Sequence, residues 1–181
     1  MAYLILGLIL WVVAHLFKRV APDLRERMGN AGKALAAVGI LAGLVLMIYG
    51  YRQADFVNIW FPPAWTVHLN NLMMLGAVFL YGMSATKGRL RGALRHPQLT
   101  AVKVWAVAHL LVNGDLASLI LFGGLLAWAV LEVVVINLSE TWERPAPGEA
   151  KRDIILVVIT VVLFFGMTFV HNWLGVWPFP G

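Results

Sequence analysis

The fold is decided by one stretch of the chain, VKVWAVAHLLVNGDLASLILFGGLLAWAVLEVVVINL, which runs from Val102 to Leu138. It is apolar almost throughout, and it is much longer than the roughly 20 residues that a helix needs to cross about 30 Å of hydrocarbon. Asn113-Gly114-Asp115 interrupts it, and Gly123-Gly124 is a second weak point. We therefore expect a helical hairpin with two shortish arms that turns at one of these two places.

The composition of the whole chain is that of an integral membrane protein. Of the 181 residues, 61% are hydrophobic and 13% are charged, and the mean hydropathy is +0.81. A soluble domain is about half apolar and about one quarter charged. These values exclude a water-soluble enzyme, a disordered chain and a fibrous protein. The absence of cysteine excludes disulfides and thiolate metal sites.

Four further segments are apolar enough to cross a bilayer: Ala2–Phe17, Ala34–Tyr51, Pro62–Ser84 and Ile154–Trp173. We interpret the first as a retained helix and not as a signal peptide, because no basic residue precedes it and Lys18-Arg19 closes its far end. Together with the hairpin they predict an all-α, polytopic bundle of about six transmembrane segments. We expect residues 1–181 to form a single domain in the lipid bilayer.

The basic residues collect in three loops. The first group is Lys18, Arg19, Arg25, Arg27 and Lys33, the second is Lys87, Arg89, Arg91, Arg95 and Lys103, and the third is Arg144, Lys151 and Arg152. Loops rich in Lys and Arg face the cytoplasm. All three can do so only if the chain between Lys103 and Glu140 enters the membrane and returns. Both termini are then periplasmic, and the charges are topology signals, which argues against a nucleic-acid partner.

The five histidines sort by depth. His15 and His96 lie near the cytoplasmic ends of their segments, His68 and His171 lie near the outer ends, and His109 lies between these layers. Two imidazoles from separate helices at one depth are the usual axial pair of a buried b-type haem. We therefore predict that His15 and His96 ligate haem b. The bland alternative for each histidine is a hydrogen bond to a carbonyl or a lipid headgroup.

Arginines beside His96 suit the carboxylates of such a haem. Arg89, Arg91 and Arg95 are the candidates for pairing with its two propionates. The chain has no C-x-x-C-H motif, so the haem would be held non-covalently. It also has no HExxH motif, which argues against a zinc hydrolase.

Three polar residues lie near the break in the hairpin, namely Asn113, Asp115 and Ser118. Such residues cap a broken helix, or else form a proton or substrate site. Catalytic residues cannot be identified from these patterns alone, and Asp115 and His109 are the candidates for shuttling protons. Glu132 is expected to pair with Arg or His from a neighbouring helix, or to be protonated.

The central string resembles the signature of the NnrU family of bacterial membrane proteins. It comprises Arg95-His96-Pro97, then the seven residues WAVAHLL from Trp105 to Leu111, and then Asn113-Gly114-Asp115, Ser118 and Phe122-Gly123. The closing segment HNWLGVWP, residues 171–178, is similar to the C-terminal element of that family. The resemblance covers nearly the whole chain. It implies a protein of the bacterial inner membrane that is linked to nitrite and nitric oxide reduction in denitrification.

The NnrU family is related to plant zeta-carotene isomerase, a membrane haem protein that isomerises a polyene double bond. This resemblance implies haem ligation by the R-H-P histidine, His96, and by an earlier histidine near the first span, His15. The isomerase carries a cysteine three residues before its R-H-P histidine, and here that residue is Ala93, which excludes a sulfur ligand. The implied role is a haem-dependent isomerase or oxidoreductase with an apolar substrate, or an accessory partner of a membrane reductase.

An alternative resemblance concerns the isoprenylcysteine and phospholipid methyltransferases, in which R-H-P also opens a membrane hairpin. Those enzymes bind S-adenosylmethionine and carry two adjacent glutamates further along the chain. Here Glu140 and Glu143 are not adjacent. Methyl transfer therefore ranks second to the haem hypothesis, and the sequence leaves open whether the protein is an enzyme.

Overall fold

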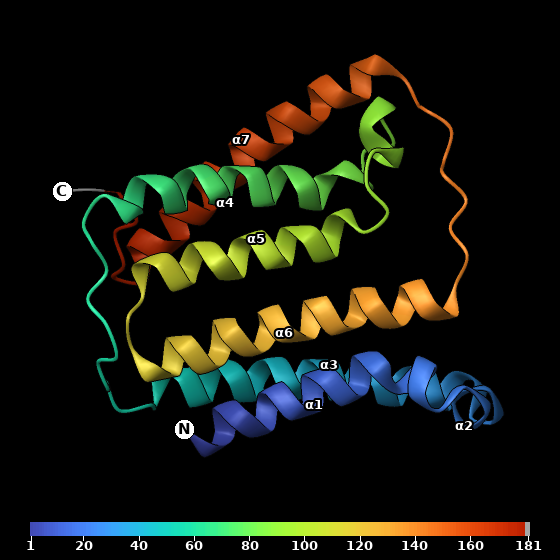
Figure 1. Ribbon diagram of the computed structural model, residues 1–181, viewed down its shortest axis with the longest axis horizontal. Helices are drawn as coiled ribbons and strands as arrows, with labels where there is room; N and C mark the ends of the chain where they lie inside the picture. Colours follow the sequence, from blue (N-terminus) through green and yellow to red (C-terminus); the bar gives the residue numbers. More distant parts are fainter. Residues whose placement is uncertain (180–181) are drawn as a thin grey trace. The chain divides into compact units, whose positions relative to one another are not determined.

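The computed structural model describes residues 1–179 and is helical along most of this length (Figure 1). Its elements are α1 (Ala2–Val20), α2 (Pro22–Arg27), α3 (Gly29–Arg52), α4 (Thr66–Met83), the 3-10 helix η1 (Arg89–Gly92), α5 (Pro97–Val112), α6 (Leu116–Ser139) and α7 (Ala150–Trp173). The described residues contain no β-strand, only an isolated bridge between Asn58 and Asp115. The predicted all-α class is confirmed. The C-terminal residue, Gly181, lies outside the described residues.

The long apolar stretch breaks where its polar tripeptide lies. Helix α5 ends at Val112, and α6 begins at Leu116. The alternative turn at Gly123-Gly124 is wrong, because both glycines lie inside α6. The expectation of two short arms is half wrong: α5 has 16 residues, whereas α6 has 24. The second arm is long because nothing within its apolar sequence stops a helix before Ser139.

The chain divides into two compact units. The first unit comprises Met1–Trp60 and Gly114–Ser139, and the second comprises Phe61–Asn113 and the described residues from Glu140 onward. The three long helices of the first unit are α1, α3 and α6, and those of the second are α4, α5 and α7. The break between α5 and α6 is therefore also a boundary between units.

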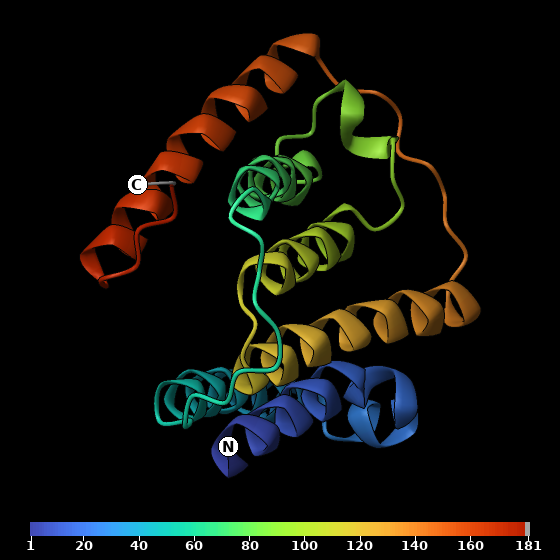
Figure 2. The ribbon, with the colours of Figure 1, turned by 60° about the vertical axis from the view of Figure 1, so that its left-hand side comes forward.

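In the first unit, α1 packs against both α3 and α6, as Figures 1 and 2 show. The approach of α1 to α3 is so close that a Cβ atom on Gly7 would lie 2.8 Å from the carbonyl oxygen of Gly43. Small residues allow this because they bring two helix backbones together. On the other side, Gly124 of α6 faces Leu8, and Glu132 bonds Arg19. Hence α1 and α6 run in the same direction.

In the second unit, α4 packs against both α5 and α7 (Figure 2). Near the end of α4, Gly82 faces Leu156, which lies close to the start of α7. Near the start of α4, Asn71 donates a hydrogen bond from Nδ2 to the carbonyl oxygen of Pro178 at 2.9 Å. Helices α4 and α7 therefore run in opposite directions, and α5 runs back alongside α4 (Figure 1).

Four helices are long and apolar enough to cross a membrane, namely α1, α3, α6 and α7. Helix α5 is apolar but shorter, and α4, which carries His68, Asn70 and Asn71, is not among the four. Side chains on α7 such as Val162 and Phe169 are 63% and 72% exposed. An apolar face of this kind needs lipid or protein to cover it. The structure therefore agrees with a helical membrane bundle, and the number of six segments remains a prediction.

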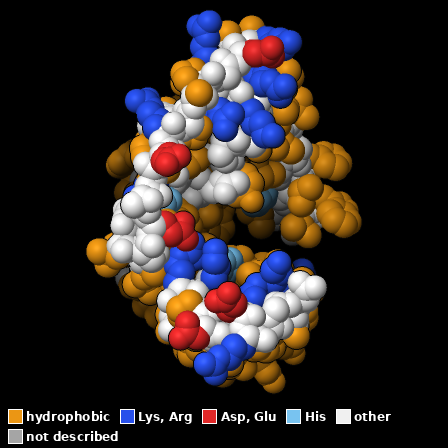
Figure 3. Space-filling model, turned by 90° about the vertical axis from the view of Figure 1, so that its right-hand side faces the viewer, with side chains coloured by type: hydrophobic (Ala, Val, Ile, Leu, Met, Phe, Trp, Pro, Cys, Tyr) orange, Lys and Arg blue, Asp and Glu red, His pale blue; other side chains and the backbone are white. Residues whose placement is uncertain are grey.

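Basic side chains gather at one end of each unit (Figure 3). In the first unit this basic end carries α2, and in the second unit it carries η1 and the start of α7. Of the 14 Lys and Arg residues, 12 belong to these two ends, whereas Lys103 lies near the middle of α5 and Arg52 lies at the end of α3. At the opposite end of the second unit, Phe61, Trp65 and Trp173 are 84%, 62% and 78% exposed. Exposed aromatic rings at the ends of apolar helices are typical of a membrane–water interface.

Candidate functional site

His15 lies in the seam between α1 and α6 of the first unit. Its imidazole centroid is 4.3 Å from the ring centroid of Trp11 and 4.7 Å from that of Trp128. Its Nδ1 atom is 2.8 Å from the carbonyl oxygen of Trp11, one turn earlier in α1. A carbonyl only accepts, so Nδ1 must donate its proton and Nε2 carries the lone pair. Metal-ligating histidines adopt this arrangement in most proteins.

A buried ion pair follows one turn further along the same seam. Arg19 Nη1 lies 2.7 Å from Glu132 Oε1, and the two side chains are 17% and 6% exposed. The expectation that Glu132 pairs with an Arg or His of a neighbouring helix is confirmed. Three more atoms here are buried without a hydrogen-bond partner among the described residues: Glu132 Oε2 and the indole nitrogens of Trp11 and Trp128. The seam thus holds more polar groups than its own contacts satisfy.

His96 belongs to the second unit, where it precedes α5 as the N-cap residue. Pro97 opens the helix, which suits it because the first N–H of a helix has no intrahelical partner. The carbonyl oxygen of His96 accepts the first helical bond from the Thr100 N–H at 2.9 Å. The half-buried His96 therefore lies at the basic end of its unit. Its pairing with His15 remains a prediction.

The arginines expected to hold propionates also lie at the basic end of the second unit. The backbone N–H of Arg89 donates a hydrogen bond to Asp153 Oδ2 at 3.1 Å, which joins η1 to the start of α7. Arg91 lies in η1 and is half-buried. Arg95 donates from Nη2 to the carbonyl oxygen of Glu140 at 2.5 Å. The loops that carry the arginines are therefore ordered by specific contacts, and the propionate role remains a prediction.

Asp115 caps α6. Its Oδ1 atom accepts the Ser118 N–H at 2.9 Å, and its Oδ2 atom accepts the Ser118 hydroxyl at 2.5 Å. The same hydroxyl is 2.8 Å from the hydroxyl of Tyr51 on α3. In addition, Asn113 donates to the carbonyl oxygen of His109 at 2.8 Å and closes the end of α5. The capping interpretation of this polar group is confirmed, while proton transfer by Asp115 remains a prediction.

Two further histidines, His109 and His171, each lie near the end of their own helix, α5 and α7, in the second unit. His109 Nδ1 is 2.9 Å from the carbonyl oxygen of Trp105, and His171 Nδ1 is 2.7 Å from that of Met167. His109 is the fourth residue from the end of α5, and its intermediate depth in the membrane remains a prediction. His68 is exposed near the start of α4.

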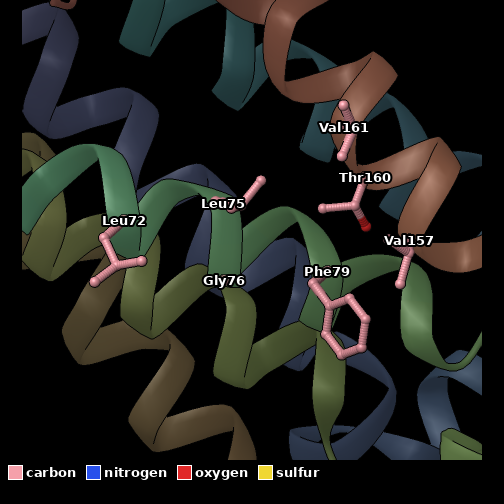
Figure 4. Close-up of a pocket in the computed structure, with 7 residues that line it drawn as sticks. All are labelled: Leu72, Leu75, Gly76, Phe79, Val157, Thr160 and Val161. Atoms are coloured by element: carbon pink, nitrogen blue, oxygen red, sulfur yellow. The ribbon is translucent and has the colours of Figure 1, made fainter.

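A groove of about 310 Å³ lies between α4 and α7 of the second unit (Figure 4). It is lined by Leu72, Leu75, Gly76, Phe79, Val157, Thr160 and Val161. The hydroxyl of Thr160 is bonded to the carbonyl oxygen of Leu156 at 2.8 Å, so the lining is apolar in effect. The groove suits a hydrocarbon chain and offers no group for acid–base chemistry.

Within residues 1–179 the structure shows no group of three or more His, Asp or Glu side chains that could hold a metal ion.

A comparison with known proteins identifies the family of the chain. No curated protein and no solved structure matches the chain. The profile of the family described as NnrU protein matches residues 3–178, which is nearly the whole chain. The protein therefore belongs to the NnrU family.

Proposed function

We propose that this NnrU protein binds one haem b between His15 and His96 and has a redox-linked role in nitrite and nitric oxide metabolism. The role is that of a haem-dependent isomerase or oxidoreductase, or that of an accessory factor for a membrane reductase. The observation that carries the proposal is the setting of His15. A carbonyl holds its Nδ1 proton, and two indole rings flank its imidazole.

The residues around His15 fit a haem ligand in three ways. The bond to the Trp11 carbonyl selects the tautomer whose Nε2 binds iron, and it raises the basicity of the ring. The indoles of Trp11 and Trp128 give the apolar, water-poor surroundings that favour a non-covalent macrocycle. The buried indole N–H groups of Trp11 and Trp128 have no hydrogen-bond partner among the described residues, so the seam has donors to offer to a polar ligand group.

The second ligand of the proposal, His96, comes from the other unit. The positions of the two histidines support this role. Each histidine lies at the basic end of its own unit, and if both basic ends face the cytoplasm, the two histidines lie at one membrane depth. Arg89, Arg91 and Arg95 precede His96 in the same loop and offer cations for two propionates. Asp153 orders this loop through the backbone N–H groups of η1.

When bound, the haem supplies an iron that can change its oxidation state inside the membrane. The chain's own residues would do the rest. His15 and His96 would set the potential through their imidazoles. Trp11 and Trp128 would exclude water, and the arginines would neutralise the carboxylates. The Arg19–Glu132 pair would keep the His15-bearing face of α1 against α6.

We also propose that both basic ends face the cytoplasm of a bacterial cell and that the N-terminus is periplasmic. Support comes from each unit separately. In the first unit, α1 and α6 both end at the basic end, and α3 begins there. In the second unit, α4 ends at the basic end, and α5 and α7 begin there. One orientation thus satisfies the positive-inside rule for every helix.

The test is a cofactor assay on wild-type protein purified in detergent from haem-replete cells. The proposal expects a Soret band, sharp α and β bands after reduction with dithionite, and about one haem b per chain by the pyridine haemochrome method. A colourless protein would refute it, and retained S-adenosylmethionine would then favour the methyltransferase alternative. Conversion of an added polyene by the haem-loaded protein would select the isomerase role, and co-purification of a reductase would select the accessory role.

A further inference from the structure

The groove between α4 and α7 has the length and the exposure that an acyl chain needs. Along α4 it extends from Leu72 to Phe79, which is roughly 10 Å at 1.5 Å per residue. One leaflet of a bilayer contributes about half of the roughly 30 Å of hydrocarbon. Leu72 and Val161 are 68% and 43% exposed, so the groove opens to the surroundings of the unit. Figure 4 shows Leu75 and Thr160 extending toward one another from the two helices.

The groove itself offers nothing to the polar part of a ligand. Thr160 is the one lining residue with a polar side chain, and its hydroxyl donates to the carbonyl oxygen of Leu156. A polar group placed among the other lining residues would be buried without a hydrogen-bond partner, which is costly. The polar part of an amphiphile in this groove must therefore lie beyond one of its two ends.

At one of these ends, the face of α7 that lines the groove continues into a contact with η1. Asp153, Val157, Thr160 and Val161 have the spacing i, i+4, i+7 and i+8, which places them on one face of the helix. The carboxylate of Asp153 accepts the backbone N–H groups of Arg89 and of the next residue, at 3.1 and 3.4 Å. Because Asp153 is one turn from Val157, η1 lies at this end of the groove.

The segment that contains η1 carries cations without a partner. Within the part of the chain that the structure describes, the side chains of Lys87, Arg89 and Arg91 make no ion pair and no hydrogen bond. Lys87 and Arg89 are exposed. No Lys or Arg occurs in residues 61–86, which include α4, or in residues 153–179, which include most of α7. The unpaired cations therefore lie at one end of the groove only.

We propose that the groove binds one acyl chain of an anionic phospholipid, whose phosphate is held by Lys87 and Arg89. Basic residues beside transmembrane helices on the cytoplasmic side bind anionic headgroups, and the guanidinium fork matches a phosphate. The charge decides between the possible occupants. A neutral hydrocarbon makes no use of the cations, and a free phosphate makes no use of the groove. The proposal goes beyond haem binding and stands without it.

The test is native mass spectrometry of the full-length protein in detergent, titrated with dioleoyl phosphatidylglycerol or with dioleoyl phosphatidylcholine. The two lipids have the same chains, and only the first has a net negative charge. We expect one phosphatidylglycerol per chain and a preference over phosphatidylcholine on the order of 20-fold, since each of two cations contributes about fivefold. The double variant Lys87→Gln/Arg89→Gln should lose this preference. Arg27→Gln/Lys33→Gln removes two exposed cations from the first unit and should keep it.

A second variant tests the groove. A Cβ atom at Gly76 meets nothing within 4 Å, so Gly76→Leu extends a side chain into open space in the groove. It should weaken the binding of both lipids by at least about 10-fold, because leucine takes the place of several methylene groups. The matched control is Gly166→Leu. Gly166 has the same open space on α7 but does not line the groove, so this variant should bind lipid like the wild type.

Three results would overturn the proposal. They are equal affinity of the wild type for the two lipids, equal effects of Gly76→Leu and Gly166→Leu, and displacement of phosphatidylglycerol by millimolar inorganic phosphate, which would indicate a free phosphate site. Helical circular dichroism shows that each variant is folded. Haem content is read from the same samples. A colourless protein that still prefers phosphatidylglycerol would refute the haem proposal alone, and a haem-loaded protein without this preference would refute the lipid proposal alone.

Discussion

Arg19 Nη1 lies 2.7 Å from Glu132 Oε1, although the two residues are 113 positions apart in the chain. The bond joins the end of α1 to the last third of α6 inside the first unit, and both side chains are largely buried. Charges in an apolar setting are costly unless they are paired. The pair therefore fixes which face of α1 meets α6, and that face carries His15.

Breaking this pair should destabilise the first unit strongly. Glu132→Gln leaves the Arg19 guanidinium facing a neutral amide, and such losses cost about 3–5 kcal/mol. The double variant Arg19→Leu/Glu132→Leu should recover most of this free energy, because it removes both charges. Unfolding in mixed detergent micelles, followed by circular dichroism, measures the effect. Glu149→Gln removes an exposed partner of Lys151 and should change stability by less than about 0.5 kcal/mol. A stable Glu132→Gln protein would contradict the role given to the pair.

The contact between α1 and α3 gives a second prediction, on glycine. A Cβ atom at Gly50 would collide with the backbone of Leu4, whereas one at Gly166 of α7 would meet nothing within 4 Å. Gly50→Ala should therefore destabilise the protein by about 1–3 kcal/mol through overpacking. Gly166→Ala should be neutral or stabilising, because alanine favours helix over glycine by about 1 kcal/mol. The unfolding curves of the two variants measure these changes in stability. Equal changes in Gly50→Ala and Gly166→Ala would contradict the close contact between α1 and α3 as the cause.

The cap of α6 gives a third prediction. Asp115→Ala removes both acceptors of Ser118 and should cost about 1 kcal/mol, the usual value for an N-cap. Asp115→Asn keeps a good capping side chain and should cost less. The same unfolding assay compares them. If Asp115→Asn is as stable as the wild type yet inactive in an assay of turnover, the carboxylate has a chemical role beyond the cap.

Membrane orientation is testable by cysteine labelling, because the chain has no cysteine of its own. We place single cysteines at Gln53 and Ala64, at the outer ends, and at Asn30 and Ala146, at the basic ends, all of which are exposed. In intact spheroplasts an impermeant maleimide should label the first two, and the last two only after lysis. Labelling of Asn30→Cys or Ala146→Cys without lysis would reverse the orientation of that unit.

Much of the fold follows from local features of the sequence. Apolar length predicts α1, α3, α6 and α7, and the polar tripeptide at 113–115 predicts the break before α6. The choice between that break and Gly123-Gly124 needed tertiary information, because Gly124 is used as a flat surface for Leu8 and not as a turn. Periodicity shows that a residue lies in a helix, but it does not show which helix faces it.

The candidate sites show the same limit. The apolar sequence around Glu132 predicts either a pair with Arg or His of a neighbouring helix or protonation, yet nothing in the spacing of residues identifies Arg19. Tyr51 was not singled out, since a tyrosine at the end of an apolar helix is ordinary, and its bond to Ser118 depends on α3 meeting α6. Depth grouped His171 with His68, and the antiparallel α4 and α7 do carry these two residues at the same end of the second unit.

The most direct test of the central proposal is the haem content of ligand variants. We compare His15→Ala and His96→Ala with His68→Ala and His109→Ala, each purified from haem-replete cells and normalised to protein. The account predicts that only the first two lose the Soret band, while all four keep their helical circular dichroism. A Soret band of wild-type intensity in folded His15→Ala or His96→Ala protein would contradict it.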